Sequence, residues 1–460
     1  LYNSGIFQRS AVALTVDGKD FTATEVDYFY HATLNSVASS NYSSYMGIDT
    51  SKSMKDQTMN AMAKMLLQID AEEDITWDQY LKDTAKSNLT RIYLMSEKAK
   101  AEGMTFDDHM QEEMQSNIDT ITAYAKQNGM TFASYLKRAY GSNMTESIFK
   151  ELCEMDALAT HYQEQYLDSL TYTDAELEAC YEADKNSYDM TDYEYISFKA
   201  TADSTTDADG NTVDPTDEEQ AAAKKAAEDA AADAAERYAA GETLEDIAAS
   251  YQEEGTYADT DMMNWVFDAS RTEGETGTVN TDSNIYFVLF HSRARQDYQV
   301  VNARHILFEA DTSALDSTSE TYEADVADIK ESAHNDAEKA LKEWQDGGAT
   351  AELFAQMAGE LSGDAGSASN GGLYEGISKT TNFIPEFLDW CFADGRKVGD
   401  AGVIDTSYGS HVMYLDSFGD PYWKVQATNT LKNDAYTAWL AENGTTDAVT
   451  EGSGMQYVGY

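Results

Sequence analysis

The stretch His305-Ile-Leu-Phe308 repeats Tyr195-Ile-Ser-Phe198 at a distance of 110 residues, and this repeat decides the fold. The same distance relates Leu244-x-x-Ile247-Ala248 to Phe354-x-x-Met357-Ala358. Similarity of a chain to itself at a fixed distance indicates copies of one folding unit. The chain is therefore predicted to contain two tandem units of roughly 100 residues, the size of a small domain. Each unit reads as a strand, one or more helices and a closing strand.

The second copy is longer than the first in a single place. Trp265-Val-Phe267 matches Trp390-Cys-Phe392 at a distance of 125 residues, so 15 residues are added between the matched segments. They fall within Ser362–Ile384, which begins with a polar stretch rich in Gly. Loops of this composition let backbone approach a ligand closely and are poor core material. We therefore expect the second copy to carry a site that the first lacks.

Two histidines also distinguish the copies. His305 stands where the first copy has Tyr195, and His411 stands where it has Tyr286. A single His in a strand is more often structural than catalytic, but two at the first and last strands of one unit favour a site. If those strands are adjacent, the two rings meet and can share hydrogen bonds.

Asp364 and Thr406 are the residues that could join this network.

Three other kinds of site have weaker support from the sequence. A metal at the two histidines would lack a helical i,i+4 partner and a marked third ligand. Cys391 could be a nucleophile beside a His, but Val266 occupies the same position in the first copy, which favours a core role. No G-x-S-x-G elbow of a serine hydrolase occurs.

Composition limits the class of protein. The 460 residues suggest several domains, and an apolar fraction of 42% is sufficient for packed cores. The net charge of -52 would repel phosphate backbones and anionic lipid, which argues against nucleic-acid binding. The three cysteines form no disulfide framework or zinc motif, and no apolar run reaches the roughly 18 residues of a membrane-spanning helix.

The N-terminal part is predicted to be a hairpin followed by helices. Asp17-Gly18 lies between two short apolar runs and indicates a type I′ turn, and Thr22-x-x-Glu25 forms a capping box before a helix. Gly103-Met-Thr-Phe106 and Gly129-Met-Thr-Phe132 each place Gly after one helix and Thr before the next. A second capping box, Thr173-x-x-Glu176, precedes the change to strand-like sequence, so we expect a boundary near residue 190.

Two further segments carry structural predictions. The Ala-rich run Ala221–Ala240 is expected to be a solvated surface helix, following an exposed loop at 201–219. After His411, the spacing of Trp439 and Leu440 with earlier apolar residues indicates a helix that ends at Asn443-Gly444. We expect this tail to pack on the N-terminal part, with Met455–Val458 adding a strand beside Val12–Val16.

A set of motifs in the second copy resembles, in order, the signature of parvulin-type peptidyl-prolyl isomerases. These motifs are Ala303-Arg-His305-Ile-Leu-Phe308, Phe354-Ala-Gln-Met-Ala358, Ser362-x-Asp364-x-Gly-Ser367-x-x-Asn370-Gly-Gly372, Pro385-Glu-Phe387 and Thr406-x-Tyr-Gly-x-His411. The preceding copy resembles a degenerate parvulin. Residues 1–190 look like the helical chaperone domain of PrsA-like and SurA-like foldases. Asn370–Glu375 and Asp389–Phe392 resemble extracellular foldases of Gram-positive clostridia.

The resemblance implies an α+β multidomain fold. It comprises a helical SurA-like chaperone domain at 1–190, a degenerate parvulin-like domain at 191–297, a parvulin domain at 298–420, and a C-terminal segment at 421–460 that completes the N-terminal domain. The two parvulin-like domains would both be α/β.

Site roles also follow from the resemblance. His305 and His411 would be the paired histidines of the centre, with Thr406 in their network and Asp364 at or next to a position that holds Cys or Asp in relatives. The proline-binding pocket would be lined by Leu373, Phe383, Phe387 and Tyr408. Phe383 stands where Met is usual, and the family's Gly-Asp-Leu-Gly is replaced by Gly372-Leu-Tyr-Glu375, which leaves the rate open. Glu309–Ser313 lacks the basic residues of phosphate-selective relatives.

The implied function is that of a prolyl isomerase and chaperone for secreted proteins, with no cofactor or metal. The alternative is a non-catalytic holdase that binds unfolded clients. Its partners would be unfolded polypeptides with X-Pro bonds, and a homodimer is compatible with the resemblance. We expect the extracellular face of the cell membrane or secretion, because of the family and because the sequence begins at Leu1, which is compatible with an upstream signal or lipid anchor.

Overall fold

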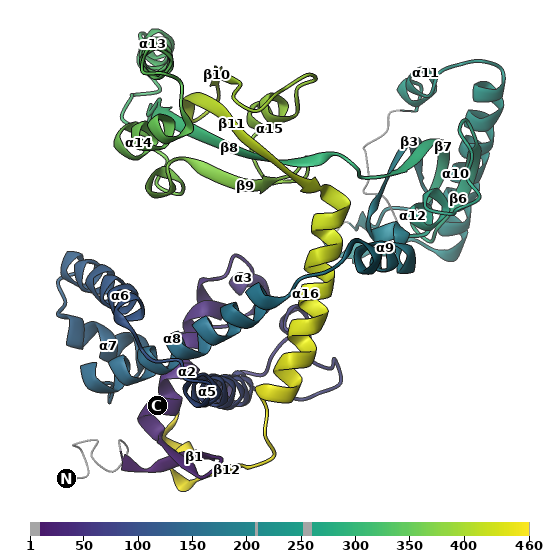
Figure 1. The fold of residues 1–460 in the computed structure, drawn as a ribbon. Coiled ribbons are helices and arrows are strands. Elements are labelled where there is room, and N and C mark those ends of the chain that lie inside the picture. Colours follow the sequence, from purple (N-terminus) through teal and green to yellow (C-terminus); the bar gives the residue numbers. More distant parts are fainter. Residues whose placement is uncertain (1–9, 208–209, 252–259, 460) are drawn as a thin grey trace. The chain divides into compact units, whose positions relative to one another are not determined.

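The computed structural model describes residues 10–207, 210–251 and 260–459. They form two compact units, one of Leu1–Tyr172 with Thr430–Tyr460 and one of Thr173–Asn429 (Figure 1). The mixture of helices and small sheets confirms the α+β multidomain prediction. The two units divide before helix α9 (Asp174–Ala183), whose Tyr181 packs with Trp423 of the second unit. The predicted domain boundary near residue 190 stays a prediction. The finer division into four domains stays a prediction.

The first unit begins with the predicted hairpin of β1 (Val12–Val16) and β2 (Lys19–Thr22). Asp17 and Gly18 both have positive φ, as a type I′ turn requires. Thr22 and Glu25 form the predicted capping box at the start of α2 (Ala23–Ser39).

Helices make up most of this unit. After α2 they are α3 (Ser43–Met46), α4 (Ala61–Leu66), α5 (Trp77–Ala101), α6 (Asp108–Gln127), α7 (Phe132–Tyr140) and α8 (Glu146–Ser169), with the short 3₁₀ helix η1 (Met54–Asp56). Gly103 and Gly129 follow α5 and α6 with positive φ, as predicted. Thr131 caps α7, but Asp107 caps α6 instead of the expected Thr105.

The C-terminal segment completes this unit. From Thr430 onward, α16 (Tyr422–Asn443) packs on α5 and α8, where Trp439 stacks on Tyr166 with ring centroids 4.5 Å apart. This contact confirms the predicted return of the C-terminal helix. The added strand is β12 (Val449–Glu451), antiparallel to β1, and not Met455–Val458. Those residues lie at the 3₁₀ helix η4 (Ser453–Tyr457), because Met455 and Val458 turn inward to join the apolar core.

The second unit holds two antiparallel sheets that repeat one topology. The first has the order β3-β7-β6 and the second β10-β11-β8-β9. The strands of the first are β3 (Asp189–Lys199), β6 (Thr276–Asn280) and β7 (Asn284–Arg295). Those of the second are β8 (Gln299–Glu309), β9 (Leu373–Ile377), β10 (Ala401–Asp405) and β11 (Gly409–Pro421). The correspondence of β3, β7 and β6 with β8, β11 and β10 agrees with the sequence repeat, and the added segment supplies β9.

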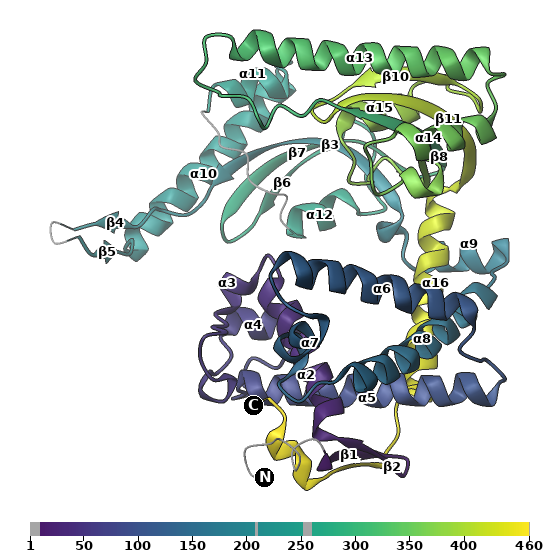
Figure 2. The same cartoon turned by 90° about the vertical axis from the view of Figure 1, so that its left-hand side faces the viewer.

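Each sheet is covered by helices on its two faces. The first has α10 (Asp217–Ala239) and α11 (Leu244–Ala249) on one face and α12 (Thr260–Val266) on the other. The second has α13 (Tyr322–Asp346) and α14 (Ala351–Leu361) on one face and α15 (Pro385–Phe392) on the other. Helix α13 packs on β8, β10 and β11; it is seen lengthwise in Figure 2 and end-on in Figure 1. Short elements complete the unit: η2 (Lys185–Ser187), β4 (Thr205–Thr206), β5 (Thr212–Val213) and η3 (Ala368–Asn370).

Helix α10, predicted as a solvated surface helix, lies at the surface but buries one face. Ala227, Ala231 and Ala234 are buried and pack against Ile196 and Phe287 of the sheet. A row of Ala at helical spacing lets a helix lie close to a sheet, so the small residues serve as a packing face.

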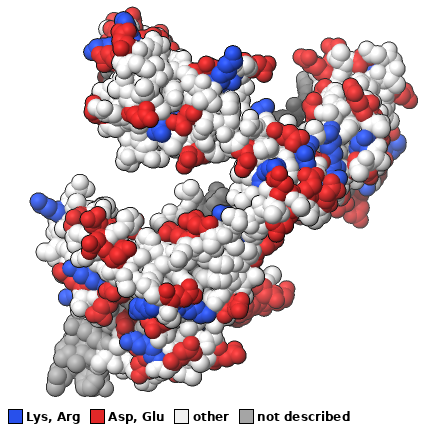
Figure 3. All heavy atoms as spheres, viewed as in Figure 1, with Lys and Arg blue, Asp and Glu red and all other residues white. Residues whose placement is uncertain are grey.

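The excess of acidic residues in the sequence is visible on the surface. Acidic side chains are spread over the face shown in Figure 3. No helix among the described residues is both long and apolar enough to cross a membrane.

Candidate active site

Two adjacent strands bring His305 and His411 together. In the pairing of β8 with β11, His305 lies opposite Met413 and His411 opposite Leu307, so the two histidines are diagonal neighbours on one face. Their Nδ1 atoms are 2.9 Å apart and their rings are nearly parallel, with centroids 5.2 Å apart. Both side chains are buried. This is the pairing that the sequence repeat predicted.

Strand alternation explains which face the histidines occupy. Ile306 and Val412 point toward α13 and α14, whereas Ala303 and Met413 point toward α15. Since successive side chains of a strand alternate between faces, His305 and His411 lie on the α15 side. Phe387 of α15 contacts both rings edge-on.

The inserted loop supplies the partners of His305. Its Nε2 lies 2.8 Å from Asp364 Oδ2 and 3.1 Å from Ser367 Oγ. Asp364 also accepts hydrogen bonds from the Tyr374 hydroxyl and the Gly366 amide. Asp364 is thus placed where it was expected. Ser367 was not predicted as a site residue, although it stands in the quoted Gly-rich motif.

Thr406 holds the other end of the network. Its Oγ1 lies 3.0 Å from His411 Nε2 and accepts a hydrogen bond from the Tyr408 amide. All four imidazole nitrogens of the pair therefore have a hydrogen-bond partner, in a continuous chain from Thr406 to Asp364.

Burial sets the charge state of this chain. Burial lowers the pKa of His305, against the opposing effect of Asp364. Burial and the neighbouring His305 lower the pKa of His411 to about 4. Burial alone would raise the pKa of Asp364, but hydrogen bonds from Ser367, His305 and Tyr374 outweigh it and hold that pKa well below its usual range. At neutral pH the pair is therefore uncharged and the carboxylate is ionised.

These charges fix the hydrogen positions. An ionised Asp364 can only accept, so neutral His305 donates from Nε2 and accepts at Nδ1. His411 must then donate from Nδ1 and accept at Nε2 from the Thr406 hydroxyl, whose one hydrogen is shared with the Gly409 carbonyl oxygen 3.1 Å away. We assign this single direction, from Thr406 through both rings to Asp364, to the neutral site.

Glycine allows the loop to lie against β8. Gly372 has a φ of 72°, and its carbonyl accepts the His305 amide at 2.9 Å. A Cβ at this position would lie 2.3 Å from the His305 carbonyl oxygen, which no side chain tolerates. The Asn370-Gly-Gly motif is thus explained by close backbone approach.

An apolar cavity of about 250 Å³ opens beside the paired histidines. Its lining residues are His305, Leu307, Asp364, Tyr374, Asn382, Phe383, Ile384, Phe387, Tyr408 and His411. Phe383, Phe387 and Tyr408 lie where the resemblance implied. Leu373 does not line the cavity; Tyr374 does. The reason is that β9 pairs Tyr374 with Ala303, whose side chain faces α15, so the preceding Leu373 points to the other face.

The first copy has no imidazole at the matching place. Tyr195 and Tyr286 come together there, with ring centroids 5.9 Å apart, in an apolar cluster with Met262 and Val266 of α12. The same diagonal position on the sheet is therefore part of a hydrophobic core in one copy and of a polar network in the other.

Cys391 behaves as a core residue. It is buried among the apolar side chains on the α15 face, and burial raises the pKa of its thiol to about 12. A thiol at such a pKa supplies almost no thiolate at neutral pH, so the nucleophile alternative has no support.

A comparison with family models supplies the deciding observation. Residues 286–417 match the model of the PPIC-type PPIase domain. This segment is thus similar in sequence to PPIC-type PPIase domains, and we call it the PPIase domain. The match begins in β7 and ends in β11, so it contains the paired histidines, the inserted loop and the cavity of the PPIase domain.

Solved structures were compared over the whole chain. PrsA from Bacillus subtilis is 14% identical, with 83% of this chain and 91% of that chain covered and a TM-score of 0.34. Foldase protein PrsA from Streptococcus pneumoniae is 13% identical, covering 84% and 94%, with a TM-score of 0.28. A SurA-like chaperone from Campylobacter jejuni is 15% identical, covering 95% of each chain, with a TM-score of 0.19. These scores establish no common arrangement of whole chains, and no curated protein matches in sequence.

Two histidines of the PPIase domain lie in different environments, which should shift their pKa values in opposite directions. His411 should titrate near pH 4, whereas His334 should titrate above 6.5, because its hydrogen bond to Asp405 raises its pKa. The unfolded chain takes up a proton between about pH 6.5 and 4 that native His411 does not, so stability falls by up to about 3 kcal/mol as the pH falls through that window. Titration of the imidazole signals by NMR measures both values. A His411 pKa near 6.5 would contradict the neutral hydrogen-bond chain.

Proposed function

We propose that the PPIase domain catalyses cis–trans isomerisation of X-Pro bonds and that the whole chain is a PrsA-like foldase with chaperone activity. The observation that carries this proposal is the apolar cavity beside the uncharged histidine pair. Rotation about an X-Pro bond faces a barrier of about 18–20 kcal/mol because amide resonance is lost in the twisted state. Catalysis needs no nucleophile, only a site that binds the twisted amide better than the planar isomers.

The lining residues suit this task. The centroid of the Phe383 ring lies 5.0 Å from those of both Tyr374 and Phe387, and these three rings would hold the proline ring by apolar contact. The cavity is smaller than the roughly 300 Å³ lower limit of drug-sized ligand sites, which fits a single ring. The hydrogen-bonded histidines would form a rigid polar floor that keeps its dipoles oriented as the amide twists.

The experiment is a prolyl isomerisation assay with the full chain and a proline tetrapeptide. An isomerase accelerates the slow cis-to-trans phase in proportion to enzyme concentration. A holdase gives no acceleration while still suppressing aggregation of an unfolded client. The holdase alternative is not favoured, since the paired histidines, the loop and the cavity are all present.

Peptides with a phosphorylated residue before proline should be poorer substrates than unmodified ones. The cavity lining includes no Lys or Arg among the described residues, and acidic Glu309 ends β8, with Asp311 two residues further on. A like charge near the site at an effective dielectric of 20 to 80 costs about 1 kcal/mol or more, so kcat/KM should fall about fivefold. Paired assays of the two peptides measure this ratio. A preference for the phosphorylated peptide would contradict it.

We further propose that clients are unfolded secreted polypeptides and that the protein acts at the extracellular face of the membrane or after secretion. The support is the resemblance of residues 1–190 to foldase chaperone domains together with the PPIase domain. A four-domain division at 190, 297 and 420, a lipid anchor and a homodimer belong to the same proposal. Cell fractionation tests the compartment, and light scattering of the purified chain tests the dimer.

A further inference from the structure

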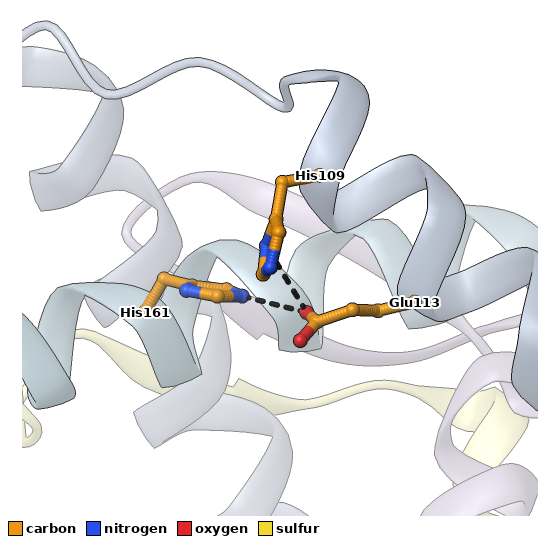
Figure 4. A group of neighbouring side chains, drawn as sticks. All are labelled: His109, Glu113 and His161. Carbon is orange, nitrogen blue, oxygen red and sulfur yellow. Dashed lines mark hydrogen bonds and ion pairs between the residues drawn. The ribbon is translucent and has the colours of Figure 1, made fainter. Parts of the chain in front are cut away.

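Helices α6 and α8 of the first unit bring two histidines and a glutamate together. His109 and Glu113 are one helical turn apart on α6, and His161 reaches them from α8 (Figure 4). Their ligand atoms all lie within 4.8 Å of one another. No other such group of three was found among residues 10–207, 210–251 and 260–459. This group lies in a different unit from the PPIase domain.

Ordinary hydrogen bonding explains only half of this geometry. His161 Nε2 lies 3.0 Å from Glu113 Oε2, which a hydrogen bond accounts for. His109 Nδ1 lies 3.8 Å from the same oxygen, too far for a hydrogen bond, yet its exposed ring turns toward it (Figure 4). Two ligands on one tetrahedral zinc ion, each bound at about 2.1 Å, are about 3.4 Å apart, which lies between the two observed distances.

A second carboxylate lies beside His161, the half-buried histidine of the group. Glu164 Oε2 lies 3.4 Å from His161 Nδ1, on the opposite side of the ring from Glu113. A carboxylate beside one ring nitrogen favours the N–H there and so leaves the lone pair of the other nitrogen for the metal, as is usual around metal-bound histidines. Glu164 would thus be the outer partner of His161.

The surroundings admit an ion with its water. Glu113 and His161 also line a cavity of about 210 Å³ between α6 and α8, which would provide an entry path and room for a coordinated water. The net charge of -52 raises the local concentration of cations. Two imidazoles and one carboxylate suit zinc and its neighbours better than magnesium or calcium, which prefer oxygen ligands.

We propose that His109, Glu113 and His161 bind one Zn²⁺ ion, with water as the fourth ligand and Glu164 as the outer partner. The ion would join α6 to α8 and stabilise the helical unit against separation of these helices. This proposal stands independently of the isomerase activity.

The test is a calorimetric titration of the chelator-treated full chain with ZnCl₂, followed by thermal unfolding with and without the ion. We expect one ion per chain and an upward shift of the unfolding midpoint that grows with zinc concentration. Glu113→Gln or His109→Ala should weaken binding more than tenfold, and Glu164→Gln about tenfold. Both Glu113 and His109 are exposed, so these variants should fold normally.

His334→Ala is the matched control, because His334 is also an exposed histidine paired with a carboxylate but belongs to no group of three. Its zinc binding should equal that of the unchanged chain. The proposal is overturned if no stoichiometric binding is seen, if His109→Ala and Glu113→Gln bind zinc as the unchanged chain does, or if His305→Phe abolishes the signal. The last result would assign the ion to the histidine pair of the PPIase domain.

Discussion

Replacing both His305 and His411 with Phe is expected to lower kcat/KM for a proline peptide by about 100-fold or more, the cost of removing preorganised polar groups from an active site. Phe keeps the ring volume against Phe387 but removes every hydrogen bond between Thr406 and Asp364. The floor of the cavity then loses its fixed polar groups while its apolar walls remain. The isomerisation assay measures the rate, and circular dichroism checks that the variant is folded.

The first copy provides the control. Tyr195→Phe combined with Tyr286→Phe changes the matching pair of residues in the other sheet, and the isomerase rate should not change. Full activity in a folded His305→Phe, His411→Phe variant would show that the cavity alone suffices and that the paired histidines are not needed. Loss of activity in a folded tyrosine variant would assign the active site to the first copy.

The histidine pair could be predicted from sequence because two simple regularities determine it. Matching positions in the repeat identified His305 and His411 as differences on a common framework. Adjacent strands with a side-chain period of two then made contact between them the natural outcome. Asp364 could be proposed from its place in the added segment, but its distance from His305 depends on the loop path.

The path of the inserted loop and the side chain of β9 that faces the cavity could not be predicted in this way. Ser367 contacts His305 only because the loop turns back at Gly371 and Gly372, both with positive φ. Leu373 and Tyr374 exchanged roles because a one-residue difference in the phase of β9 reverses which side chain faces the cavity. Neither the turn nor the phase is encoded in the local apolar pattern.

Contacts between segments that are distant in the sequence explain the remaining differences between the predicted and the observed structure. The Ala-rich face of α10 looks solvated in isolation, because Ala favours a helix whether or not it is packed, and only the sheet beneath it shows that the face is buried. At the C-terminus, the apolar run of Met455 and Val458 suggested a strand, but the backbone pairs with β1 earlier, at Val449–Glu451.

Removing residues 445–460 is expected to destabilise the first unit by about 5 kcal/mol or more. The deletion takes Met455 and Val458 from the apolar core, each worth about 1.5–3 kcal/mol when fully buried. It also removes β12 from the edge of β1 and the Gly459 amide that donates to buried Asp27. Domains of this size are stable by about 5–15 kcal/mol, so the unit should lose much of its cooperative unfolding. Calorimetry of the shortened and full chains measures the change, with the PPIase assay reporting on the second unit.

Lys86→Ala gives the control for this deletion, since it breaks the contact of Lys86 with Glu451 of β12, together with an ion pair to Asp83 within α5, and leaves the apolar core intact. An ion pair with a half-exposed carboxylate contributes at most about 1 kcal/mol, so this variant should unfold almost as the full chain does. The shortened chain should also aggregate more readily, because β1 becomes an open sheet edge. An unchanged unfolding transition after the deletion would mean that the C-terminal segment does not contribute to the stability of the first unit.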